Sequence, residues 1–122
     1  MSYIITKQFM FSASHQLNGL PNDHPCSRLH GHNYIVELEL QSEHLNDIGF
    51  VKDYRSLDGF KTYVDEILDH RHLNEVFHPM QTSAENIAKR LFDVAQEIVG
   101  KKIFAVKISE TEKTWATYRP TK

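Results

Sequence analysis

Two segments in the first third of the chain alternate apolar and polar residues with the period of two that is typical of β-strands. In residues 3–15 one face carries Phe9, Phe11, Ala13 and His15. From His30 onward the apolar face is formed by the even positions His32, Tyr34, Val36, Leu38 and Leu40. We therefore expect two half-buried strands. The first carries a histidine at the end of its inner face, and the second carries histidines at its beginning.

The middle of the chain has the longer period of α-helices. Apolar residues between 57 and 68 recur at helical spacing and stop before Asp69. Thr82-Ser83-Ala84-Glu85 has the pattern of a capping box, in which Thr82 caps a second helix and Glu85 reaches back to it. Gly100 is well placed to end that helix. The sequence thus predicts two helices.

Alternation returns near the C-terminus. The positions expected to face inward are Phe104, Val106 and Ile108, and Glu110 continues the same face. Residues 115–119 are expected to form a closing strand. The order β-β-α-α-β-β predicts an α+β fold with a four-stranded antiparallel sheet and two helices, in a single domain spanning residues 1–122. Such a sheet has two edges that need covering, which favours oligomerisation through them.

Composition narrows the class of protein. With 122 residues, 40% hydrophobic and 25% charged, the chain fits one ordinary globular domain. Its net charge of -2 comes without a block of Lys or Arg, which argues against nucleic-acid binding. No apolar run reaches membrane-spanning length, and the first residues lack the apolar core of a signal peptide. The expected location is the cytoplasm, without membrane attachment. A single cysteine excludes an intramolecular disulfide.

Histidine is the anomaly in this composition, with 8 in the chain. His30 and His32 form a His-x-His pair that projects two imidazoles from the same face of a strand, and His15 ends another inner face. Three imidazoles suit a catalytic zinc ion, which keeps its fourth position open for water or substrate. An isolated His-x-His pair is more often a core or surface feature. Three inward histidines favour metal binding, because burying them without a partner would be costly.

Cys26 lies shortly before the His-x-His pair and has three possible roles. The commoner fate of a lone cysteine is to be a small buried hydrophobe. Beside a zinc ion its thiolate would be favoured, which would make it a base or a nucleophile. As a fourth ligand it would instead close a structural zinc site. The His-x-His spacing leaves these alternatives open.

Two carboxylates also stand out. Asp69 precedes His70 where the first helix is expected to end, so His70 either complements the helix dipole or forms a proton relay with Asp69. Glu110 is either a solvated strand end or the floor of a pocket. A buried Glu110 would need a partner with paired donors, such as the amidine-like edge of a guanidine-containing ring.

Six motifs in this order resemble those of the 6-pyruvoyl-tetrahydropterin synthase family, the tunnelling-fold (T-fold) pterin enzymes. The motifs are residues 11–15, 26–34, 49–54, 68–74, 83–86 and 110–111. The resemblance runs over nearly the whole chain, from Phe9 to about Tyr118. It implies the T-fold, in which trimers close their sheets into a barrel and pair into hexamers.

The resemblance assigns roles to residues of the predicted site. The zinc ligands would be His15, His30 and His32. Cys26 would be the general base that moves protons on the substrate side chain. A neighbouring subunit would contribute Asp69 and His70 as a proton relay. The zinc ion would polarise substrate oxygens and acidify neighbouring C–H bonds.

Substrate binding is implied for three positions. Glu110 would anchor the pterin through its 2-amino and N3 edge and join the relay. Ser83 and Glu85 lie in the segment whose counterpart contacts the pterin. Thr82-Ser83 stands where relatives often have Pro-Thr, and a hydroxyl is retained at Ser83.

The interval between Cys26 and His30 distinguishes branches of this family. Cys-x-x-x-His-Gly-His resembles the carboxy-forming enzymes, whereas the mammalian pyruvoyl-forming enzyme has a longer interval. The resemblance thus implies a lyase that converts 7,8-dihydroneopterin triphosphate to 6-carboxy-5,6,7,8-tetrahydropterin, acetaldehyde and triphosphate, a step towards queuosine. The alternatives are a 6-pyruvoyl-tetrahydropterin synthase or a related dihydropterin side-chain lyase. An alternative of another class is a non-catalytic zinc-binding protein.

Overall fold

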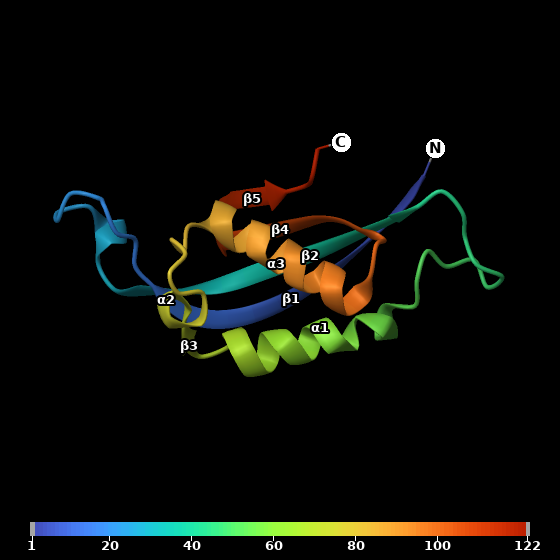
Figure 1. The fold of residues 1–122 in the computed structure, drawn as a ribbon, viewed down its shortest axis with the longest axis horizontal. Helices are drawn as coiled ribbons and strands as arrows, with labels where there is room; N and C mark the ends of the chain where they lie inside the picture. Colours follow the sequence, from blue (N-terminus) through green and yellow to red (C-terminus); the bar gives the residue numbers. More distant parts are fainter. Residues whose placement is uncertain (1, 122) are drawn as a thin grey trace.

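The computed structural model describes residues 2–121 and contains one five-stranded sheet with helices on one of its faces (Figure 1). The strands are β1 (Tyr3–His15), β2 (His30–Ser42), β3 (Arg71–His72), β4 (Ile103–Thr111) and β5 (Thr114–Tyr118). Their order in the sheet is β3-β1-β2-β4-β5. Neighbouring strands are antiparallel except β1 and β3, which are parallel. The predicted α+β class is confirmed, but the predicted four-stranded, purely antiparallel sheet is wrong.

The additional strand is β3, which pairs with Ala13 and Ser14 near the end of β1. It has two residues, so no alternation of apolar and polar positions could reveal it in the sequence. Because β3 is held against β1, the residues just before it, Asp69 and His70, lie beside the end of β1. The short strand therefore positions a part of the candidate site.

The first long helical segment has three parts. They are a 3₁₀ turn (Tyr54–Leu57), α1 (Asp58–Tyr63) and a π-helical turn (Val64–Leu68). Together they match the helix predicted over 57–68. A short helix, α2 (Leu73–Val76), was not predicted. The long second helix is α3 (Ala84–Val99), and it ends at Gly100 as expected. The φ of Gly100 is 119°, a conformation that favours glycine.

The cap of α3 lies one residue later than the capping-box pattern predicted. Ser83 is the N-cap, and its side chain accepts a hydrogen bond from the backbone N–H of Asn86. Thr82 is therefore free of the capping role. It is completely buried and contacts His15 instead. Two adjacent hydroxyl residues both fitted the pattern, and only the packing of Thr82 decided between them.

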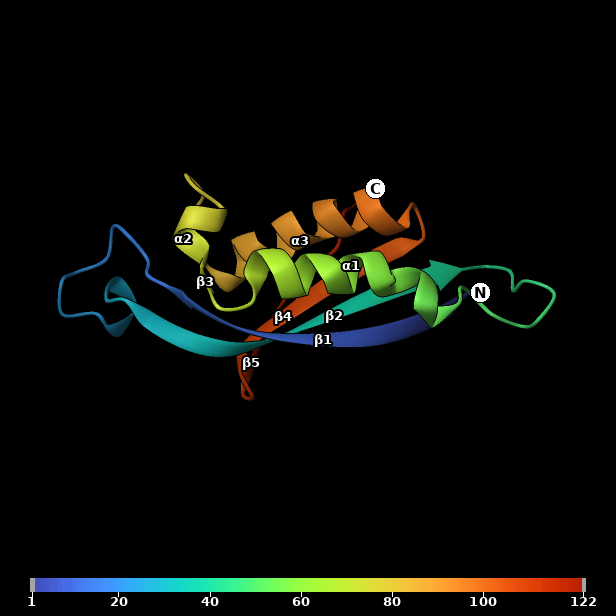
Figure 2. The same ribbon diagram turned by 90° about the horizontal axis from the view of Figure 1, so that it is seen from below.

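The core lies between the sheet and the helices α1 and α3, which cover the same face of the sheet (Figure 2). The inner faces of β1 and β2 are buried as the alternation predicted. In β4 the register shifts opposite Glu39 and Leu40, so Ile103 joins the core in place of the expected Phe104. Val106 and Ile108 face inward as predicted.

No helix of residues 2–121 covers the opposite face of the sheet (Figure 2). Polar pairs link neighbouring strands there, including Gln8 with Glu37 at 2.6 Å and Lys107 with Glu39 at 3.0 Å. Among the helices in this same part of the chain, none is both long enough and apolar enough to cross a membrane.

Candidate metal centre and active site

Three histidines meet where β1 ends and β2 begins. The antiparallel pairing places His15 directly opposite His30, and His32 opposite Ala13. The three imidazoles each offer a nitrogen, and these nitrogen atoms lie within 4.8 Å of one another. The ring centroids are separated by 4.6 Å for His15 and His30, and by 5.2 Å for His15 and His32. The strand pairing therefore assembles the cluster that the sequence suggested.

His15 is held by the segment that precedes α3. Its Nδ1 lies 2.8 Å from the carbonyl oxygen of Thr82 and 3.1 Å from the Thr82 hydroxyl. A carbonyl oxygen only accepts, so Nδ1 carries the proton and Nε2 keeps its lone pair. Burial, with a smaller contribution from the neighbouring histidines, lowers the pKa of His15 from 6.5 to about 4, so the ring is neutral near pH 7.

His30 is oriented in a similar way, and His32 is partly buried beside it. The Nδ1 of His30 donates to the carbonyl oxygen of Arg28 at 2.6 Å, which frees its Nε2. Burial lowers the pKa of His32, and His30 adds to this effect. An imidazole that donates one nitrogen to a carbonyl, as those of His15 and His30 do, is suited to hold a metal through the other nitrogen.

The donor set fits a metal by a further observation. The Nε2 of His15 is buried and has no hydrogen-bond partner within residues 2–121. A buried polar atom without a partner costs free energy, and a metal ion would give this lone pair a ligand role. The ligand cluster of the described chain contains the three histidines and does not include Cys26.

Glu110 projects from β4 toward the histidines. Its Oε2 lies 3.3 Å from the Nε2 of His15, a close approach that is not a hydrogen bond, and 3.9 Å from the Nε2 of His32. Burial raises the pKa of Glu110, and the charge of Glu85 raises it further. Glu110 thus forms part of a pocket wall and is not a solvated strand end. It also shares a hollow of about 230 Å³ with Glu85 and Trp115.

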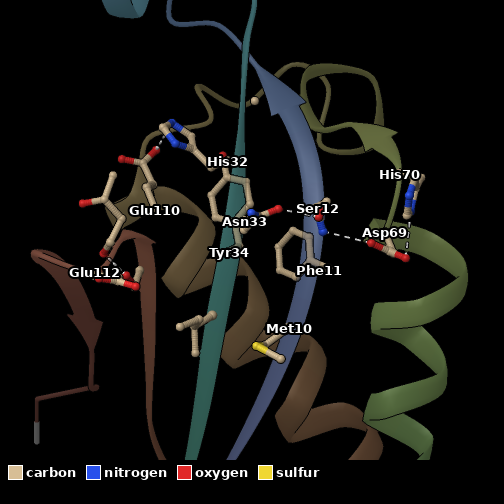
Figure 3. A pocket seen from close by; sticks show the side chains of 14 residues that line it. Met10, Phe11, Ser12, His32, Asn33, Tyr34, Asp69, His70, Glu110 and Glu112 are labelled. Atoms are coloured by element: carbon tan, nitrogen blue, oxygen red, sulfur yellow. Dashed lines mark hydrogen bonds and ion pairs between the residues drawn. The ribbon is translucent and has the colours of Figure 1, made fainter.

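A larger pocket of about 750 Å³ extends across the sheet from Glu110 to His70 (Figure 3). Figure 3 shows His32 and Glu110 at one side of this pocket, and Asp69 and His70 on the far side of β1. Within one chain the structure therefore separates the candidate proton relay from the three histidines. The residues of the relay themselves are close together.

Asp69 and His70 form a tightly held pair. One carboxylate oxygen of Asp69 lies 2.9 Å from the Nδ1 of His70, and the other accepts the backbone N–H of Ser12 at 2.9 Å. The Ser12 amide, followed by His70, lowers the pKa of Asp69. The backbone N–H of His70 donates to the carbonyl of Ser12, and His70 adopts a φ of 60°, which is uncommon outside glycine. The His70 side chain is exposed and free to meet another molecule.

Cys26 lies in a 3₁₀ turn, Pro25–Ser27, within the loop between β1 and β2. The backbone groups of Cys26 fix the turn through two hydrogen bonds. The carbonyl of Cys26 accepts the N–H of Leu17, and the N–H of Cys26 donates to the Nδ1 of His24. The thiol is half-buried. The predicted substrate residues lie at the start of α3, with Ser83 as the cap and Glu85 in the first turn.

Sequence reasoning missed several residues that the structure places at this site. Thr82 was predicted only as a helix cap, and Tyr34 only as a core residue. Burial and then Glu110 raise the pKa of the Tyr34 phenol. Asn74 ended one of the family motifs without an assigned role. The amide of Asn74 bonds both backbone groups of Gln16, the residue after His15.

The comparison with known families identifies the fold. Residues 4–121 match the family model described as 6-pyruvoyl tetrahydropterin synthase. The chain belongs to this family. Members of the 6-pyruvoyl tetrahydropterin synthase family are enzymes, and the resemblance found in the sequence motifs is confirmed.

Relatives in the family cover nearly the whole chain. A Synechocystis sp. protein named 6-carboxy-5,6,7,8-tetrahydropterin synthase is 31% identical over 95% of this chain and 92% of its own length. The 6-pyruvoyl tetrahydrobiopterin synthase of Dictyostelium discoideum is 30% identical over 95% of each chain. The structure of Caenorhabditis elegans 6-pyruvoyl tetrahydropterin synthase aligns with a TM-score of 0.87 at 25% identity, over 99% of this chain and 97% of that one. The predicted T-fold is confirmed, with a fifth strand added.

Proposed function

We propose that this protein is a zinc-dependent lyase of the 6-pyruvoyl tetrahydropterin synthase family. It converts 7,8-dihydroneopterin triphosphate, with uptake of water, to 6-carboxy-5,6,7,8-tetrahydropterin, acetaldehyde and triphosphate. This reaction is a step towards queuosine and other 7-deazapurines. The relative named 6-carboxy-5,6,7,8-tetrahydropterin synthase, at 31% identity, supports the choice of product. The short interval between Cys26 and His30 supports it as well.

The observation that carries the proposal is the buried Nε2 of His15, which has no hydrogen-bond partner in the described chain, in a cluster of three imidazoles beside Glu110. His15, His30 and His32 would hold the zinc ion, which supplies Lewis-acid polarisation of substrate oxygens when it is bound. Three protein ligands leave a position open for substrate, as in catalytic zinc sites.

The chain's own residues bind the pterin and move protons. Glu110 accepts the 2-amino and N3 N–H groups of the pterin ring, because a carboxylate in a partly buried pocket needs paired donors. Glu85 lies in the same hollow and Ser83 caps the helix beside it. Cys26 is the base that moves protons on the substrate side chain.

A second subunit completes the proposed site. The dyad of Asp69 and His70 lies across β1 from His32, and the His70 imidazole is exposed (Figure 3). β3 pairs with β1 at Ala13 and Ser14, and Asp69 and His70 bond to Ser12. Within residues 2–121, no strand pairs with the part of this outer edge that precedes Ser12, so it is open to another chain. We propose trimers paired into hexamers, in which this dyad serves the histidine centre of a neighbour as a proton relay.

The direct test is incubation of the zinc-loaded protein with 7,8-dihydroneopterin triphosphate and identification of the products by mass spectrometry. Formation of 6-carboxy-tetrahydropterin with an equal amount of acetaldehyde supports the proposal. Formation of 6-pyruvoyl-tetrahydropterin without acetaldehyde would assign the second candidate, which the Dictyostelium relative favours at 30% identity. Unchanged substrate would contradict both.

Cys26→Ala separates the enzyme from a non-catalytic zinc protein. Because Cys26 is outside the ligand cluster, the variant should retain zinc and its folded structure while turnover falls by at least about a hundredfold, the usual contribution of a positioned base. Zinc content by metal analysis and product formation are measured on the same sample. Loss of zinc and unfolding would indicate that Cys26 is a structural ligand.

A further inference from the structure

Tyr34 carries a buried hydroxyl to which no role has been assigned so far. The residue has no exposed surface, and its Oη has no hydrogen-bond partner within residues 2–121. In that part of the chain the Nε2 of His15 is the other buried side-chain atom without a partner. Native proteins rarely bury a hydroxyl unpaired, because it has given up its bonds to water without replacing them.

Both unpartnered atoms belong to the same site. Tyr34 follows His32 by two positions in β2, so the two side chains share the inner face of the strand. The Tyr34 ring stands edge-on to both imidazoles, with centroids 5.5 Å from His32 and 5.9 Å from His15. Figure 3 shows the Tyr34 ring just below His32, with Glu110 to one side. The ring is therefore part of the environment of the three-histidine centre, and its phenol feels the charge of Glu110, which lies 3.3 Å from His15.

The surrounding packing keeps the ring in this place. Phe11, which is paired with Tyr34 across β1 and β2, stacks on it with centroids 4.9 Å apart and an angle of 11° between the planes. Phe11 is itself buried. The hydroxyl cannot turn to solvent without breaking this stack. A hydrogen-bond partner therefore has to be supplied by a molecule that binds next to it.

We propose that the Tyr34 hydroxyl donates a hydrogen bond to an oxygen atom of the ligand held at the three-histidine centre. The inference rests on the proposed function, because it requires a metal at that centre. Tyr34 then selects ligands that present a hydroxyl, carbonyl or carboxylate oxygen there, and disfavours ligands that end in an apolar group. The proposed substrate side chain carries oxygens of this kind.

The experiment uses cobalt(II) as the metal and acetate as the oxygen ligand, followed by the visible absorption of cobalt. The wild type is compared with Tyr34→Phe and with the control Tyr63→Phe, which removes the hydroxyl of a half-buried tyrosine in α1. Tyr34→Phe should bind cobalt as the wild type does but bind acetate about tenfold more weakly, a difference of about 1.4 kcal/mol. The control should match the wild type in both measurements.

Thermal unfolding of the metal-free proteins provides a second readout. Tyr34→Phe should melt at the same temperature as the wild type or above it, since it removes an unpaired buried hydroxyl. A lower melting temperature would overturn the inference, because it would mean that the hydroxyl already has an acceptor, such as Glu110.

The cobalt and acetate measurements also separate a failure of the proposed metal centre from a failure of the proposed role of Tyr34. Equal acetate affinity in the wild type and Tyr34→Phe, or acetate binding by neither, would overturn the role of Tyr34 alone. A wild type that binds no cobalt would overturn the proposed metal centre and this inference together.

Discussion

Asn74 offers a sharp test of how the fold positions the metal centre. Its Oδ1 accepts the backbone N–H of Gln16 at 2.9 Å, and its Nδ2 donates to the Gln16 carbonyl at 2.8 Å. The hydroxyl of Thr82 lies 3.3 Å from the same Oδ1, and the Thr82 carbonyl accepts the Nδ1 proton of His15. One amide therefore fixes the chain next to His15 and the residue that orients its imidazole.

Asn74→Ala removes the two bonds to Gln16 and the contact with the Thr82 hydroxyl at once. A hydrogen bond contributes about 1 kcal/mol net, and a buried group left unpaired costs about 1–3 kcal/mol. Water can replace some of the lost partners in this partly buried region. We therefore expect the free energy of unfolding of the metal-free protein to fall by about 2–4 kcal/mol. Metal affinity should fall by about 10–100-fold, the usual effect of removing a group that orients a metal ligand.

Urea unfolding of the metal-free protein measures the stability, and competition with a chromophoric chelator measures zinc affinity. Asn46→Ala is the matched control, because the Oδ1 of Asn46 accepts the N–H groups of Ile48 and Phe50, both at 3.0 Å, in an exposed loop. The control should lose under about 1 kcal/mol, since water replaces exposed bonds, and should keep its zinc affinity. An Asn74→Ala protein with unchanged zinc affinity would refute the positioning role, whatever its stability.

Two other predictions concern His15 and Gly100. The metal-free protein should lose up to about 3 kcal/mol of stability as the pH falls from 6.5 to about 4, because burial lowers the pKa of His15 and the unfolded chain takes up the proton first. Urea unfolding of the wild type and His15→Asn across this range isolates the effect, and parallel profiles would contradict it. Gly100→Ala should cost about 1–3 kcal/mol through backbone strain alone, since φ is 119° and nothing lies within 4 Å of an added Cβ. Urea unfolding measures this cost, and an unchanged midpoint would show that the strain is relieved.

The long strands and the long helix were predictable because each repeats its pattern of buried and exposed positions over many residues. β1 and β2 have 13 residues each, so the period of two persists long enough to be seen. α3 has 16 residues and a stripe that packs on the sheet. β3 has two residues and the bulge in β4 displaces one position, so neither leaves a periodic pattern.

Within the candidate site, the metal-ligating residues were predictable from the sequence, but the residues that orient them were not. His15, His30 and His32 were recognisable because imidazoles on inner strand faces are rare without a purpose. The roles of Thr82 and Asn74 depend on hydrogen bonds across 67 and 58 residues of sequence separation, and no local pattern encodes such distances.

The sequence by itself determined the chemistry that the site can use, since it places histidines at the ends of two alternating strands and a carboxylate on the inner face of another. The tertiary structure decided how these groups meet. Strand pairing sets His15 opposite His30, and the packing of β4 brings Glu110 within 3.3 Å of His15. Burial then lowers the pKa of His15 and of His32, and it leaves the Nε2 of His15 without a hydrogen-bond partner in residues 2–121. Desolvation and contacts between distant segments exist only in the folded chain, and they turn a set of donors into a candidate metal centre.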